Sequence, residues 1–142
     1  MSTFIKTMVV SSMVASLMLF SSFAKAGASP LTVDGATTID TAQAKAMWLD
    51  GVAFFDPRSL SDWNQGHIPK AININRTDPA AYTRAAIESA LKKDQPVVIY
   101  CNGVGCMKSA RTAAELVSLG YSKVFYYREG FPEWSFAGHP VE

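Results

Sequence analysis

The apolar positions of this chain fall into short runs, separated by longer stretches in which apolar residues recur at helical spacing. The short runs occupy residues 52–55, 71–74, 97–100 and 124–127. Runs of this length, rich in valine, isoleucine and aromatic residues, are typical of strands buried on both faces. The pattern therefore predicts four core strands, and a further apolar piece at 31–33 predicts one edge strand.

Four helices are expected between and after these strands. They span residues 41–50, 59–64, 79–93 and 109–119. Asp40 or Thr41, Asp78 and Ser109 stand where a side chain caps the first turn of a helix. Strands that alternate with helices through short connections predict an α/β domain with a central, mainly parallel sheet and helices on both faces.

Cys101 is the first candidate for chemistry. It directly follows the apolar run at 97–100, and a glycine-containing loop separates it from the next helix. Parallel sheets bind ligands beyond the carboxyl ends of their strands. The helix N-terminus and Lys108 both favour the thiolate over the thiol. We therefore predict that Cys101 is a catalytic nucleophile, and the alternative is a buried structural cysteine.

The residues after Cys101 form the candidate substrate-binding loop. It comprises Asn102, Gly103, Val104, Gly105, Cys106, Met107, Lys108 and Ser109. Gly103 and Gly105 permit positive φ and let a small substrate approach the main chain. The sixth residue after Cys101 is Met107, which lacks the guanidinium that a phosphatase of the Cys-x5-Arg kind uses to bind phosphate.

The length of 142 residues suits one domain, but the N-terminal segment has a different character. Residues 1–26 contain Lys6, an apolar stretch at 8–20 and the sequence Ala-Lys-Ala at 24–26. This order is typical of a secretory signal peptide. Serines interrupt the apolar stretch, which is shorter than the ~20 residues of a membrane span. We expect cleavage after Ala26, a single domain at 27–142, and a periplasmic or secreted protein.

The net charge and the number of cysteines and histidines indicate which kinds of partner the chain could bind. Without Lys6 and Lys25 the chain has 11 basic and 12 acidic residues, a net charge of about −1. A near-neutral chain without a basic stripe argues against nucleic acid, and we expect no membrane partner after signal cleavage. The two cysteines and two distant histidines lack metal-ligand spacing, so we expect neither a metal nor another cofactor.

Three separated motifs together resemble the rhodanese-like sulfurtransferase family, over about residues 39–141. The motifs are FDPR at 55–58 with GHIPKAINI at 66–74, Tyr100-Cys101 with Lys108-Ser109 beyond the loop, and GFPEW at 130–134 with GHPV at 138–141. Three motifs in order at ordinary spacing are more specific than any one of them. The resemblance implies a rhodanese-like α/β fold of the exported single-domain type.

The resemblance also implies a reaction. The Cys101 thiolate would attack the outer sulfur of a thiosulfate-like donor, carry that sulfur as a persulfide, and pass it to a thiol or cyanide. The expected partners are thus a small sulfur donor and a thiol acceptor. Asp56 and Arg58 are expected to give structural support below the loop rather than to contact substrate.

The loop departs from the family pattern. A common version has arginine five residues after the cysteine and serine next, whereas Lys108 and Ser109 stand seven and eight residues after Cys101. Cys106 lies inside this longer loop, as a candidate redox partner of Cys101, a member of a lasting structural disulfide, or a free loop residue. Glu129 replaces the first glycine of the family's ending.

Two other functions therefore stay open. One is a thiol-disulfide redox module that uses Cys101 and Cys106. The other is a binding module that keeps the rhodanese-like fold without catalysis.

Overall fold

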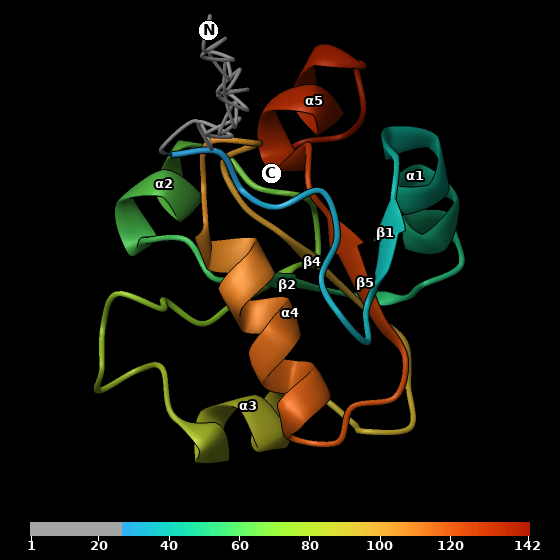
Figure 1. Cartoon of the computed structure of the whole chain (residues 1–142). Coiled ribbons are helices and arrows are strands. Elements are labelled where there is room, and N and C mark those ends of the chain that lie inside the picture. The colour runs from blue at the N-terminus through green and yellow to red at the C-terminus, as the bar shows by residue number, and fades with distance from the viewer. Residues whose placement is uncertain (1–26) are drawn as a thin grey trace, which may run out of the picture.

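A computed structural model describes residues 27–142, so the expected signal peptide at 1–26 lies outside the described residues (Figure 1). The strands are β1 (Thr37–Ile39), β2 (Ala53–Asp56), β3 (Ile72–Asn73), β4 (Val97–Tyr100) and β5 (Val124–Tyr127). The helices are α1 (Thr41–Leu49), α2 (Leu60–Gln65), α3 (Arg84–Ala90), α4 (Lys108–Ser118) and α5 (Gly130–Phe136). Within 27–142, no helix has both the length and the apolar character that crossing a bilayer requires.

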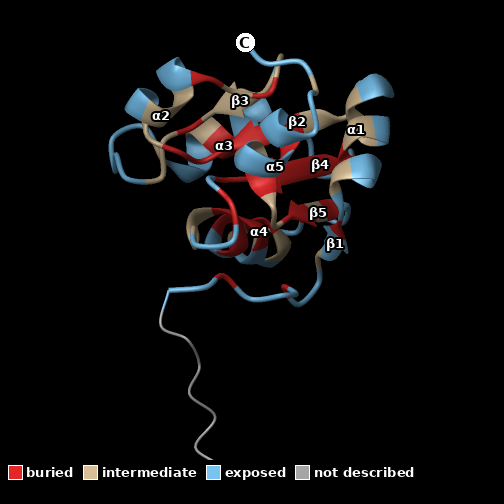
Figure 2. Cartoon of the chain, turned by 90° about the horizontal axis from the view of Figure 1, so that it is seen from above, coloured by how far each residue is buried: buried red, intermediate tan, exposed pale blue. Residues whose placement is uncertain are grey.

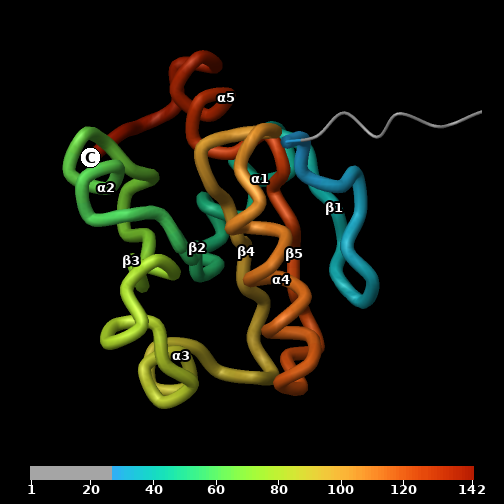
Figure 3. The backbone as a smooth tube through the Cα atoms, turned by 60° about the vertical axis from the view of Figure 1, so that its left-hand side comes forward, coloured from blue at the N-terminus to red at the C-terminus, as the bar shows by residue number. Residues whose placement is uncertain are grey.

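The five strands form one sheet in the order β1-β5-β4-β2-β3, and every pair is parallel. All carboxyl ends therefore lie at one edge of the sheet. The loop after β4, the start of α5 and the first described residues meet at this edge (Figure 3). The predicted α/β class with a parallel sheet and helices on both faces is confirmed.

The central strands are buried between two layers of helices (Figure 2). Successive residues of a strand point to opposite faces, so Val97 and Ile99 pack with α3 and α4, whereas Val98 and Tyr100 pack with α1 and α5. This two-sided burial explains why the core strands are continuous apolar runs in the sequence.

The edge strand lies at a different place from the one predicted. The structure has β1 at Thr37–Ile39 and not at 31–33, where Leu31 is 72% exposed. Ile39 is buried and pairs with Tyr127 of β5. The two threonines and the isoleucine of β1 suit a strand, but their pattern is too short to stand out from the loop before it.

The α3 helix begins at Arg84 and not at residue 79 as predicted, because a turn at Asp78 precedes it and Thr83 caps it. The Asp78 carboxylate accepts the Ala80 N–H at 2.9 Å and forms a turn instead of a helix cap. Thr83 then caps α3 by accepting the Ala86 N–H at 3.1 Å. Tyr82, between them, donates to the Glu115 carboxylate of α4 at 3.0 Å, so a tertiary contact holds this segment out of the helix.

The packing of α4 on the sheet generates a stability prediction. Leu116 is fully buried in α4, whereas Leu49 at the end of α1 is 68% exposed. We expect Leu116→Ala to lower the free energy of unfolding by about 2–5 kcal/mol, because it leaves a cavity in the core. Leu49→Ala is the matched control and should change it by less than about 0.5 kcal/mol. Urea unfolding measures both, and equal midpoints would contradict the assigned core.

Candidate functional site

Cys101 lies directly after the carboxyl end of β4, and the residue is only 1% exposed. Its carbonyl oxygen accepts the Phe131 N–H at 2.9 Å, which connects it to the start of α5. The neighbouring Gly130 has φ +64°, and a Cβ there would collide with the Cys101 carbonyl. Glycine at 130 is therefore required for the close approach of α5 to the cysteine.

The loop after Cys101 is a tight turn held by backbone contacts. Gly103 has φ +92°, and its carbonyl accepts the Cys106 N–H at 3.0 Å. On the outer side of the turn, the Val104 carbonyl accepts both the backbone N–H of Ser29 at 2.7 Å and its hydroxyl at 2.9 Å. The loop thus has a defined path although Val104 itself is exposed.

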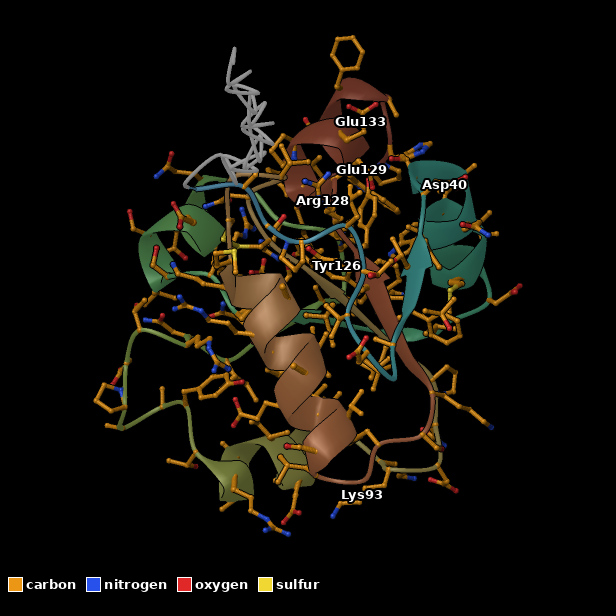
Figure 4. The ribbon with its side chains drawn as sticks, in the orientation of Figure 1. Asp40, Lys93, Tyr126, Arg128, Glu129 and Glu133 are labelled. Carbon is orange, nitrogen blue, oxygen red and sulfur yellow. A yellow bond between two sulfur atoms is a disulfide. The ribbon has the colours of Figure 1, made fainter. Side chains whose placement is uncertain are left out.

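A disulfide joins Cys101 and Cys106 across this turn, with their Cα atoms 6.2 Å apart. Figure 4 shows the bond at the N-terminal end of α4. The sequence left three roles open for Cys106. The disulfide rules out a free loop residue in the oxidised state that the structure shows. Cys101 has no free thiol here, and reduction is needed before it can act as a nucleophile.

The start of α4 differs from the prediction that Ser109 caps it. The helix begins at Lys108, its N-cap residue is Met107, and no side chain caps it. Ser109 lies inside the first turn and is buried, and its Oγ has no hydrogen-bond partner among the described residues. The first amides of α4 consequently have no side-chain acceptor, and they remain available to an anion at the loop.

Arg58 joins the segments on the other side of the loop. Its guanidinium is 2% exposed and forms a salt bridge with Asp56 at 2.7 Å. It also donates to the Gly66 carbonyl at 2.8 Å and to the Asn102 side-chain oxygen at 3.0 Å. Burial lowers the pKa of Arg58, but the hydrogen bond and the charge of Asp56 outweigh burial and raise it overall. The positive charge is therefore retained and directed at the loop.

Asn102, which accepts a hydrogen bond from Arg58, also connects the loop to α2. Its amide nitrogen donates to the Asp62 carboxylate at 3.1 Å. The hydrogen bond from Ser59, and more weakly the charge of Lys108, lower the pKa of Asp62. Asp62 therefore remains ionised beside Asn102 and accepts its hydrogen bond as a carboxylate.

A shallow hollow of about 320 Å³ lies beside the loop. Its lining consists of Asn102, Gly103, Val104, Gly105, Glu129, Pro132 and Glu133. Glu129 and Glu133 project from the α5 segment at this end of the sheet (Figure 4). The charged residues of this lining are acidic, and the positive groups Arg58 and Lys108 lie elsewhere around the loop.

Residues 40–137 match the rhodanese-like domain family. The chain is 30% identical over 92 residues to the thiosulfate sulfurtransferase GlpE of Pseudomonas syringae, covering 65% of this chain and 80% of that protein. It is 33% identical over 91 residues to GlpE of Pseudomonas fluorescens, covering 64% and 77%. The BH2092 protein of Bacillus halodurans shares the fold, with a TM-score of 0.65 and 24% identity over 75% of this chain and 77% of that one.

The chain belongs to the rhodanese-like domain family. The structure brings together, around the loop of this rhodanese-like domain, the residues that the sequence singled out: Cys101, the loop from Asn102 to Ser109, and the Asp56–Arg58 pair. His67, in the motif at 66–74, stacks on Trp63 and contacts the Trp63 carbonyl through Nδ1 at 3.1 Å.

Sequence reasoning missed two contacts of the rhodanese-like loop. Ser29, for which the sequence predicted no role, reaches the loop at Val104, and the Arg128 guanidinium donates to the Ser29 carbonyl at 2.9 Å. Helix α5, which begins at Gly130, was also not predicted. The sequence GFPEW was a signal for the start of α5, whereas no local pattern marks Ser29, because its partners lie 75 and 99 residues away.

The close approach of α5 to the loop can be tested at two glycines. Gly130 and Gly138 have similar positive φ values, but a Cβ has no neighbour within 4 Å at Gly138. Alanine should cost about 1 kcal/mol at Gly138 from φ alone, and at least about 1 kcal/mol more at Gly130 from the collision with Cys101. Urea unfolding measures the difference. Equal losses would show that α5 does not constrain the loop.

Proposed function

We propose that this protein is a sulfurtransferase that carries a sulfane sulfur as a persulfide on Cys101. In the first step the Cys101 thiolate attacks the outer sulfur of a thiosulfate-like donor, the donor S–S bond breaks, and sulfite leaves with the electron pair. In the second step a thiol or cyanide takes the outer sulfur, and the Cys101 thiolate is regenerated. The membership of the rhodanese-like family, with relatives named thiosulfate sulfurtransferase, supports the reaction class.

The observation that carries this proposal is the position of Cys101 between the carboxyl end of β4 and the uncapped start of α4. An anionic persulfide at this point faces the loop amides and the positive end of a helix of 11 residues. The buried, positively charged Arg58 donates a hydrogen bond to Asn102, the residue directly after Cys101. The proposed reaction develops negative charge at the same place, on Cys101 and on the sulfur that it carries.

A second candidate function is thiol-disulfide exchange, which the Cys101–Cys106 bond favours. In that case the pair would accept electrons from a dithiol or oxidise one, and no sulfur atom would be transferred. The two functions differ in whether a sulfane-sulfur donor is consumed.

We also propose that the protein works in the periplasm or outside the cell, on the strength of the signal-like sequence at 1–26. Its proposed partners are a small sulfur donor and a thiol acceptor. An oxidising compartment would let the Cys101–Cys106 disulfide form and persist, so activity there requires a reductant.

Sulfite release tests the first step directly. Reduced protein, freed of reductant and mixed with thiosulfate, should release about one sulfite per chain in a single turnover. Cys101→Ser should release none. Protein left in the disulfide state is the matched control, and it should also release none, because the nucleophile is blocked. Sulfite is quantified by a colorimetric reaction, and its absence with the reduced wild type would contradict the proposed function.

A further inference from the structure

Cys106 is placed to react with a sulfur held on Cys101. The disulfide shows that the Cys106 sulfur reaches the Cys101 sulfur without a change of fold. The turn that brings them together is closed by the hydrogen bond from the Cys106 N–H to the Gly103 carbonyl. Ser29 holds the outer side of the same turn at Val104 through two hydrogen bonds. These contacts involve backbone groups and Ser29, so opening the disulfide does not remove any of them.

We propose that Cys106 is a resolving cysteine, which gives the protein a second activity: release of hydrosulfide from the persulfide. The Cys106 thiolate attacks the inner sulfur of the Cys101 persulfide. A bond forms between the two cysteine sulfurs, the bond between Cys101 and the outer sulfur breaks, and that outer sulfur leaves with the electron pair and takes up the proton given up by the Cys106 thiol, as HS⁻. This inference rests on the proposed function, because the persulfide is its starting point.

The product of this step is the Cys101–Cys106 disulfide that the structure contains. A dithiol then reduces the disulfide and becomes a disulfide itself. In the whole cycle, thiosulfate and one dithiol give sulfite, HS⁻, one oxidised dithiol and a proton, so atoms, charge and electrons balance. The protein is then a dithiol-dependent, sulfide-releasing enzyme, with a dithiol as its second substrate.

Proximity favours this route over direct transfer to an outside acceptor. Cys106 attacks within one loop and gains the advantage of an intramolecular reaction. In the disulfide state, the residue Cys101 is 1% exposed, whereas Cys106 is only partly buried. In the reductive step, the dithiol meets the more exposed Cys106 sulfur first.

The leaving group in that reductive step is then Cys101. A thiolate of lower pKa leaves a disulfide faster. Cys101 lies between the end of β4 and the uncapped start of α4, whose N-terminal end stabilises negative charge. Attack on Cys106 frees the Cys101 thiolate that the next donor needs.

A single-turnover experiment tests the inference. Reduced full-length protein, freed of reductant under anaerobic conditions, is mixed with thiosulfate, and sulfite, sulfide, free thiols and intact mass are measured. The wild type should release about one sulfide for each sulfite and lose both free thiols. For Cys106→Ser and Cys106→Ala, each sulfite released should be accompanied by no sulfide and by one added sulfur atom retained on Cys101. Sulfite release by either variant also shows that it is folded.

The alternative outcomes separate this inference from the proposed function. A wild type that keeps the added sulfur on Cys101, with Cys106 free to react with an alkylating agent, overturns the resolving role and leaves sulfur transfer standing. Sulfide release by the Cys106 variants at the wild-type level also overturns it. If no protein releases sulfite, the proposed function fails, and the inference that rests on it fails as well. A sample without thiosulfate controls for disulfide formation by residual oxygen.

Discussion

One buried guanidinium connects the segments that form the site. Arg58 binds Asp56 at the end of β2, the Gly66 carbonyl after α2, and Asn102 in the loop after β4. The guanidinium carbon of Arg58 lies 4.7 Å from the centroid of the Phe131 ring, in α5. Taking a charge out of water is costly, and the hydrogen bonds to a carboxylate and to carbonyl oxygens offset that cost. Because the contacts come from four parts of the chain, the edge of the sheet is a single unit and not a set of independent loops.

Two further contacts act on the loop from other directions. Helix α5 approaches the Cys101 carbonyl at Gly130, and Ser29 holds the Val104 carbonyl. A short loop between a strand and a helix has few backbone conformations once its ends and its middle are held. The loop therefore keeps the two cysteines close while leaving the start of α4 without a side-chain cap. Of the thiolate, persulfide and disulfide in the proposed reaction cycle, the structure contains the disulfide.

The local pattern was a good guide to the core strands and to the place of the reactive cysteine. The core strands, the Asp40 cap of α1 and the place of Cys101 at a strand end follow from short-range hydrophobicity and capping. Two of the errors arose where distant residues decide the outcome. Tyr82, bonded to Glu115 of α4, keeps the segment before Thr83 out of α3, and pairing with β5 selects Thr37–Ile39 as the edge strand. Such partners are invisible in a window of ten residues.

By itself, the sequence determined the class of fold, the order of its elements as far as β5, and the cysteine around which the loop is built, because periodicity, capping residues and a strand end are local properties of the chain. Only the tertiary structure decided that Cys106 is bonded to Cys101, that Ser29 and Gly130 hold the loop, and that Ser109 lies inside α4 without capping it. These features depend on which groups come into contact at the carboxyl edge of the sheet. Those contacts form because segments far apart in the chain pack together there.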